Sequence, residues 1–168
     1  MAIAISLKQY LGSQKIDYDS VTHRRTACAA RSAAASKIPL DQMAKGVVLN
    51  SRSGYVLAVV PASRQVQLDK VGKCIEQPVS LASEDELVSL FPDCEPGAVP
   101  AVGAPYGLRM VMDEFLEKQT DIYFEAGDHR TLVHLDGDGF ARLTRTVTHA
   151  PISSSAADIE LATGYCGA

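Results

Sequence analysis

The fold is decided by the stretch AKGVVLNSRSGYVLAVVP, residues 44–61. It contains two apolar runs, 47–49 and 55–60, and Ser53-Gly54 lies in the polar segment between them. A serine–glycine pair between two such runs is typical of a hairpin turn. Because both runs are apolar almost throughout, we expect two strands that are buried on both faces.

Shorter elements are expected on both sides of this hairpin. Apolar residues at helical spacing predict a helix within 3–14, and the alanine-rich run 27–35 predicts a second helix after Thr26. Ser83 and Glu86 form a capping box, which predicts a helix start. The other expected elements are a strand at 16–21, a helix at 40–44 opened by Pro39, a helix capped by Ser63 that carries Val66, Leu68 and Val71, a strand end or short helix at 111–118, a hairpin of strands 121–125 and 131–135, and a closing helix at 140–147.

Strands therefore dominate the middle of the chain and helices bracket them. This order favours an α+β fold with a mixed, strongly curved sheet and helices outside it. We expect residues 1–149 to form one domain, since the chain of 168 residues has the length of a single domain. Residues 150–168 contain Ser153-Ser-Ser155 and no Lys or Arg, and we expect a poorly ordered tail there.

The charge balance limits the functions open to the chain. It has 16 Lys and Arg against 20 Asp and Glu, a formal net charge of −4. Proteins that grip a long nucleic acid usually carry a basic stripe, whereas the longest basic cluster here is His23-Arg24-Arg25. Any contact with nucleic acid should involve few phosphates. We expect no membrane partner, because no apolar run reaches the roughly 18 residues of a spanning helix.

Targeting and metal signals are also missing from the sequence. The N-terminus lacks a basic region followed by a long apolar stretch, and the four cysteines lie far apart, so a cytoplasmic location is expected. His129 and His134 are five residues apart, which places them on opposite faces of a continuous strand. No metal and no cofactor are expected.

Three places could carry chemistry. Lys45 lies where a short helix should meet a buried strand, and a fixed ammonium there could hold a phosphate or an oxyanion; it could also simply extend to solvent at a strand start. The loop 92–107 is rich in Gly and Pro, which would pre-organise backbone N–H donors, or form a plain surface loop. His129 follows Gly127-Asp128 in the second hairpin and could donate a hydrogen bond or position water, or face solvent.

Taken in order, these pieces resemble the YbaK/prolyl-tRNA synthetase-associated domain family of aminoacyl-tRNA editing deacylases. The resemblance covers about residues 5–146. It rests on His23 and Thr26 before the alanine-rich helix, then AKGVVL (44–49), AVVP (58–61), LFPDCEPGAVP (90–100) and DIYFEAGDH (121–129).

The resemblance implies a β-barrel-like sheet that is surrounded by helices. It also implies an activity, the hydrolysis of the ester that joins a wrong amino acid to a tRNA. The substrate implied is a mischarged aminoacyl-tRNA held by its acceptor end, such as tRNA(Pro) carrying a small amino acid, and a synthetase or elongation factor could raise its local concentration. The family lysine corresponds to Lys45, and the family G-x-x-x-P loop corresponds to Gly97–Ala101, where Ala101 replaces the proline beside Pro100.

From this resemblance we expect specific roles for the site residues. Lys45 should engage the terminal nucleotide, and the backbone N–H groups of Gly97 and Ala98 should bind the ester carbonyl oxygen. The resemblance also implies that a hydroxyl of the tRNA helps to activate the water. The expected substrate-binding residues are His23, Thr26, Val47, Val99, Pro100, Ala101, Gly127 and His129.

Two other functions remain open at this stage. A non-catalytic module of the same fold could bind a nucleotide or an amino acid, and Ala101 favours that alternative. A thiol-dependent enzyme could use Cys28 or Cys94, although neither cysteine has an electropositive setting in the sequence.

Overall fold

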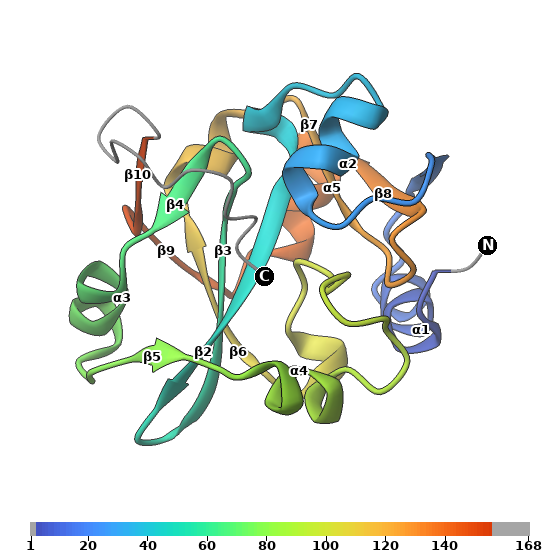
Figure 1. Cartoon of the computed structure of the whole chain (residues 1–168). Helices are drawn as coiled ribbons and strands as arrows, with labels where there is room; N and C mark the ends of the chain where they lie inside the picture. Colours follow the sequence, from blue (N-terminus) through green and yellow to red (C-terminus); the bar gives the residue numbers. More distant parts are fainter. Residues whose placement is uncertain (1–2, 156–168) are drawn as a thin grey trace.

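The structure is a computed structural model that describes residues 3–155 (Figure 1). Its helical elements are α1 Ile5–Ser13, α2 Ala29–Ala35, η1 Leu40–Gln42, α3 Leu68–Ile75, α4 Glu84–Leu90, η2 Ala104–Tyr106, η3 Glu114–Lys118 and α5 Gly137–Leu143, where η marks a 3-10 helix. Its strands are β1 Asp19–Thr22, β2 Ala44–Ser51, β3 Gly54–Pro61, β4 Arg64–Val66, β5 Ser80–Leu81, β6 Arg109–Asp113, β7 Asp121–Glu125, β8 Thr131–Asp136, β9 Thr148–Ala150 and β10 Ser153–Ser155.

The predicted central hairpin is confirmed. β2 and β3 pair antiparallel over their whole length, from Ala44 opposite Pro61 to Ser51 opposite Gly54. Gly54 has a φ of +122°, a backbone conformation that favours glycine in the turn. The hairpin is buried on both faces because it separates two apolar clusters, with Leu57 in the larger one and Ala58 in the smaller.

The strands form a mixed arrangement, as predicted. The largest sheet has the order β5-β2-β3-β6-β9, in which β3/β6 and β6/β9 are parallel and the other pairs are antiparallel. The other described strands form a sheet β1-β8-β7 and a pair β10-β4, both antiparallel. Because these strands are divided among separate open sheets, the expected closure into a barrel is not confirmed.

Helices cover this framework on several sides. Figure 1 shows α3 at one side of the large sheet and α1, α2 and α5 near the β1-β8-β7 sheet. α1 and α5 bury Leu7, Leu11 and Phe140 in the larger cluster, and α3 buries Val71 in the smaller one. Within residues 3–155, no helix has both the length and the apolar character to cross a bilayer.

The predicted helix capped by Ser63 is wrong in its first half. Residues 64–66 form β4, and α3 begins only at Leu68 after Gln67. The reason is a distant partner, since β4 pairs with β10 and the Arg64 Nε donates to Ser153 Oγ at 2.8 Å. In contrast, the Ser83–Glu86 capping box at the start of α4 is confirmed, with both reciprocal hydrogen bonds present.

The expected start of a poorly ordered tail at residue 150 is also wrong. β9 ends at Ala150, Ile152 is fully buried, and β10 pairs with β4. The buried carboxylate of Asp113 accepts hydrogen bonds from the Ile152 N–H at 3.0 Å and from Ser153 Oγ at 2.7 Å. The ordered domain therefore extends to residue 155; the rest of the predicted tail, 156–168, lies outside the described residues.

Candidate functional site

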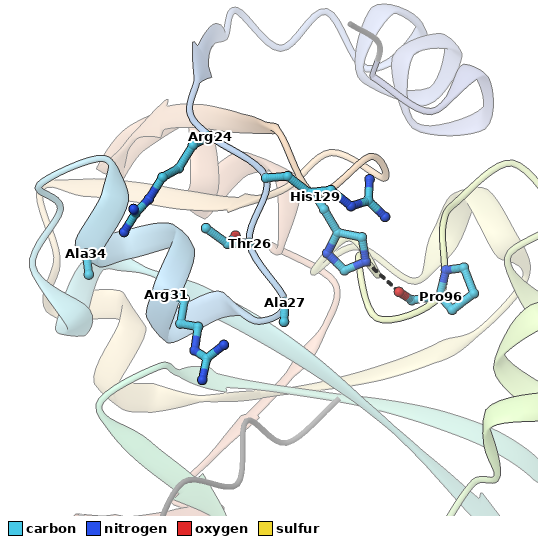
Figure 2. Close-up of a pocket in the computed structure, with 8 residues that line it drawn as sticks. Arg24, Thr26, Ala27, Arg31, Ala34, Pro96 and His129 are labelled. Atoms are coloured by element: carbon cyan, nitrogen blue, oxygen red, sulfur yellow. Dashed lines mark hydrogen bonds between the residues drawn. The ribbon is translucent and has the colours of Figure 1, made fainter.

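A cavity of about 790 Å³ lies where the segment before α2, the helix α2 itself, the loop after α4 and the β7–β8 hairpin meet. Figure 2 shows its lining side chains. The lining consists of Arg24, Arg25, Thr26, Ala27, Arg31, Ala34, Pro96 and His129. Two predicted site residues, Thr26 and His129, are therefore brought together, and Pro96 is adjacent to a third, Gly97.

The cavity wall is positively charged despite the acidic chain. The guanidinium of Arg25 forms an ion pair with Glu95 at 2.7 Å. Neither Arg24 nor Arg31 has a carboxylate partner within residues 3–155, and no acidic residue belongs to the lining. Such a wall favours an anionic ligand, because guanidinium groups bind phosphate or carboxylate oxygens in bidentate geometry.

His129 fixes the glycine–proline loop to the β7–β8 hairpin. Its Nε2 lies 2.5 Å from the Pro96 carbonyl oxygen, and since a carbonyl only accepts, Nε2 carries the proton. The expected donation of that proton to substrate or water is therefore not available. Nδ1 is buried without a partner in the described chain. The backbone also contributes, because the His129 carbonyl accepts from the Thr26 N–H at 3.2 Å.

Behind Thr26 lies a buried chain of hydrogen bonds. Thr26 Oγ1 is 2.5 Å from Ser32 Oγ, and Ser32 in turn donates to Glu125 Oε1. Burial raises the pKa of the Glu125 carboxyl, and this shift is opposed by the Ser32 hydrogen bond and by the nearby His23 and His129 side chains. A half-satisfied carboxylate this deep is unusual, because its Oε2 has no partner in the described chain.

His23 belongs to this buried region but not to the cavity lining. Its Nδ1 donates to the Arg24 carbonyl oxygen at 2.6 Å, and its backbone N–H donates to the Arg130 carbonyl oxygen at 2.8 Å. It does not cap the following helix, since α2 is preceded by Cys28 and has no side-chain cap.

The glycine–proline loop has the expected shape at Gly97 but not at Ala98. Gly97 has a φ of +83°, and a Cβ there would lie 3.3 Å from the His129 ring. Its N–H has no hydrogen-bond partner within residues 3–155. The N–H of Ala98 instead donates to the Glu95 carbonyl oxygen at 3.1 Å. The expected use of Ala98 as a donor to substrate is therefore contradicted, because its proton closes the turn.

Lys45 lies on a strand that the same loop contacts. A Cβ at Gly46 would lie 3.3 Å from the Pro100 carbonyl oxygen, so the loop packs on β2 beside Lys45. Strand alternation directs Lys45 to the opposite face of the sheet from Gly46, and Lys45 is absent from the cavity lining. Burial lowers the pKa of Lys45 from its ordinary 10.5, and no carboxylate within residues 3–155 pairs with it.

The other predicted substrate-binding residues lie inside the protein. Val47 belongs to the smaller apolar cluster, and Val99 and Ala101 belong to the larger one. Gly127 has a structural contact, since a Cβ there would meet Cys94 Sγ at 3.2 Å, and its carbonyl accepts from the Glu95 N–H at 2.7 Å. Val99, Ala101 and Gly127 therefore contribute to the packing of the loop and its neighbours, whereas Val47 lies in the other cluster.

The cysteine chemistry considered from the sequence finds little support. Burial raises the pKa of the Cys94 thiol to about 12, which keeps it protonated and a poor nucleophile at neutral pH. Cys28 is buried. In the described part of the chain, no group of three or more His, Cys, Asp or Glu side chains is arranged to hold a metal ion.

Sequence reasoning missed the arginines and the buried carboxylate. Arg24 and Arg25 were visible only as a short basic cluster. A usable signal was the spacing of Arg31 and Ala34, which is i, i+3 and places both on one face of α2, whereas Ala27 precedes the helix. Glu125 could not be recognised, since it lies 93 residues from Ser32 in the sequence.

The chain belongs to the aminoacyl-tRNA editing domain family, whose model matches residues 23–143. This range contains every residue of the cavity wall. No curated protein sequence matches the chain.

Solved structures share the fold at low sequence identity. A protein described as "a putative trans-editing enzyme for prolyl tRNA synthetase" has a TM-score of 0.80 and 22% identity, covering 92% of this chain and 99% of its own. The hypothetical protein APE2540 has a TM-score of 0.79 and 19% identity, covering 89% of this chain and 99% of its own. A protein from Marinobacter aquaeolei described as a "putative signal transduction protein" has a TM-score of 0.76 and 15% identity, covering 96% of this chain and 33% of its own.

Proposed function

We propose that this protein is a trans-editing deacylase that hydrolyses the ester of a mischarged aminoacyl-tRNA, with tRNA(Pro) carrying a small amino acid as the first candidate substrate. The observation that carries the proposal is the arginine-walled cavity beside the Gly97 loop, in a chain that belongs to the aminoacyl-tRNA editing domain family. Arginines suit the phosphates of an acceptor end, and the adjacent loop offers a fixed N–H to the ester.

In this mechanism the protein holds and polarises the ester without a covalent nucleophile. The N–H of Gly97, which has no partner among residues 3–155, donates to the carbonyl oxygen as negative charge develops there during attack by water. His129 holds the Pro96 carbonyl and so keeps this N–H in place. The ammonium of Lys45 is desolvated, has no carboxylate partner in residues 3–155 and lies outside the cavity lining, so we assign it to a phosphate of the terminal nucleotide and not to the ester.

A few positioning groups are enough to catalyse this reaction. An aminoacyl ester is already activated, so correct positioning can supply a large part of the rate enhancement. Editing is needed because one methylene gives a synthetase only about 1–3 kcal/mol of discrimination. Hydrolysis requires no cofactor, and water is the only co-substrate.

The direct test is a deacylation panel with Ala-, Cys- and Ser-charged tRNA(Pro). We expect the wild type to release at least one amino acid at well above the spontaneous rate, and Lys45→Ala to lose about 100-fold or more of kcat/KM, as electrostatic groups in active sites often do. Inactivity of both proteins on all three substrates would refute the proposal.

Gly97→Ala tests the backbone donor separately. A side chain at φ +83° is strained, at a cost of about 1–3 kcal/mol, and it would move the N–H. We expect kcat to fall more than the KM changes. Gly12→Ala is the matched control, because a Cβ at Gly12 on α1 meets nothing within 4 Å.

The second candidate is a binding module without catalysis. The commitment of the Ala98 N–H to Glu95 and the replacement of the family proline by Ala101 both favour it. In that case the protein would bind uncharged and mischarged tRNA alike and would not change the rate of ester loss.

A further inference from the structure

The end of the large sheet at β5 carries exposed apolar side chains. Leu81 on β5 and Val88 on α4 are each 52% exposed, and these two elements follow each other directly in the chain. Within the described residues, the other large apolar side chains of comparable exposure are Ile5 and Leu40. Single exposed apolar residues are ordinary on a protein surface, whereas a pair from adjoining elements is typical of an interaction surface.

The backbone of β5 forms an open edge of this sheet. β5 is the terminal strand in the order β5-β2-β3-β6-β9, and Leu81 lies opposite Leu49 of β2. The Ala82 N–H donates to the Val48 carbonyl oxygen at 3.0 Å, so Leu81 and Leu49 form a non-hydrogen-bonded pair of the antiparallel ladder. The N–H and C=O of Leu81 therefore point away from β2, where an added strand would pair with them.

The surroundings of this edge are acidic. Residues 74–108 contain no Lys or Arg, and their acidic residues are Glu76, Glu84, Asp85, Glu86, Asp93 and Glu95. Glu84 and Asp85 are exposed in the first turn of α4, and helical spacing places both on the side of Val88. A surface of this charge repels nucleic acid and attracts a cationic partner.

The two faces of the edge differ in character. Leu81 lies opposite Leu49, which belongs to the smaller apolar cluster, whereas α4 buries Leu87 in the larger cluster, on the other face of the sheet. Successive side chains of a strand point to opposite faces. A strand added at β5 would therefore meet Leu81 with one set of side chains and the acidic surface of α4 with the other.

We propose that β5 and α4 form a docking surface for another protein, which adds an extended segment of alternating basic and aliphatic residues to the β5 edge. The partner's backbone pairs with Leu81, its aliphatic side chains cover the Leu81 side chain, and its cationic side chains pair with Glu84 and Asp85 while their stems cover Val88. The affinity comes from the backbone pairing and the apolar contacts, and the charges select the partner.

A protein partner fits this surface better than a second copy of the chain. Two copies that met edge to edge would bring Glu84 and Asp85 of each copy together, and like charges across an interface are unfavourable. Figure 1 shows β5 and α4 away from α2, and no residue of β5 or α4 belongs to the cavity lining. The partner therefore leaves the arginine-walled cavity free, and this inference does not depend on the deacylase proposal.

The test is fluorescence anisotropy with the full chain and short labelled peptides of equal length. One peptide alternates Lys with Val, the second alternates Glu with Val, and the third alternates Lys with Ser. We expect the Lys/Val peptide to bind about tenfold more tightly than both others, and salt to weaken its binding. Equal binding of the Lys/Val and Glu/Val peptides, or of the Lys/Val and Lys/Ser peptides, would overturn the proposal.

One pair of variants tests the apolar contacts. Leu81→Ser with Val88→Ser should reduce the affinity for the Lys/Val peptide to that for the Lys/Ser peptide, because only the aliphatic contacts distinguish the two. Ile5→Ser is the matched control, since Ile5 is a 67% exposed apolar residue on α1, outside this surface. All three positions are exposed, and urea unfolding checks that the variants keep the fold. An equal loss in the control would refute the assigned surface.

A second pair tests the charges. Glu84→Gln with Asp85→Asn should weaken binding of the Lys/Val peptide about threefold or more. The control is Glu114→Gln with Asp138→Asn, which changes the net charge equally at the first turns of η3 and α5. A similar loss in both double variants would show a general attraction to an acidic protein and would overturn the proposal.

Light scattering after size-exclusion chromatography tests the alternative occupant. We expect the wild type and the Leu81→Ser, Val88→Ser variant to have the same oligomeric state. A wild-type dimer that is lost in this variant would identify a second copy of the chain as the occupant and would refute a separate partner. The same variant should keep the wild-type rate on any mischarged tRNA, so failure of the deacylase proposal and failure of the docking surface are distinguishable.

Discussion

The β2–β3 hairpin and the cluster behind Thr26 are both buried, but their side chains differ in polarity. The hairpin consists of aliphatic side chains that pack on two apolar clusters. The cluster of Thr26, Ser32, Glu125, His23 and His129 is polar and leaves one nitrogen of each histidine and one Glu125 oxygen without partners among residues 3–155. Apolar burial stabilises the fold directly, whereas an incompletely satisfied polar cluster costs stability. The contrast supports our proposal that the second region serves the function of the protein.

The largest loss of stability should come from a substitution in the hairpin. Leu57 is fully buried in the larger cluster, so Leu57→Ala should lower the free energy of unfolding by about 2–5 kcal/mol. Urea unfolding measures it. The control is Leu81→Ala, because Leu81 is 52% exposed and should cost far less. Similar losses at the two leucines would contradict the role assigned to the hairpin core.

A smaller effect is expected within the polar cluster. Ser32→Ala removes the hydrogen bond to the buried Glu125 carboxylate, and we expect a loss of about 1.5–3 kcal/mol in the same unfolding measurement. Ser36→Ala, at the end of α2, is the matched control, since that buried hydroxyl has no partner within the described chain. Its removal should be nearly neutral, and a reversed order of the two variants would contradict the hydrogen-bond chain.

The pH dependence of stability tests the charge on Glu125. Its folded pKa is raised above the ordinary 4.5, so its favourable contribution is complete below pH 4.5 and is lost as the pH rises through the folded pKa. The groups that face it are Ser32, His23, His129 and Asp128. Relative to Glu125→Gln, the wild type should therefore become less stable as the pH rises above about 4.5. A constant difference across that range would show that the carboxyl titrates normally.

The smallest change in stability is expected at the α4 cap, which belongs to neither the hairpin nor the polar cluster. The Ser83 backbone N–H, followed by Tyr55 and Asn50, lowers the pKa of Glu86 from 4.5 to about 2. Its contribution is present above pH 4.5 and is lost as the pH falls towards 2. The stability advantage of the wild type over Glu86→Gln should therefore shrink in acid, in the opposite direction to that at Glu125. Acid unfolding curves of the two proteins provide the measurement.

The same contrast explains how much of the molecule could be predicted from its sequence. The hairpin and the α4 cap depend on neighbouring residues, so periodicity and capping rules found them. β4 was read as helix because its partner, β10, lies far along the chain. In the site, Thr26 and His129 were predicted, but the Glu125–Ser32 bond and the occupied Ala98 N–H depend on tertiary distances that no local pattern encodes.

The anchoring of β10 by Asp113 has a practical consequence for anyone shortening this gene. A truncation after residue 149, where composition changes, would remove Ile152 from the apolar interior and strip two of the donors from a buried carboxylate. Such a product should aggregate or be degraded during expression. A product that retains Ser155 keeps the pairing of β10 with β4 and both hydrogen bonds to Asp113.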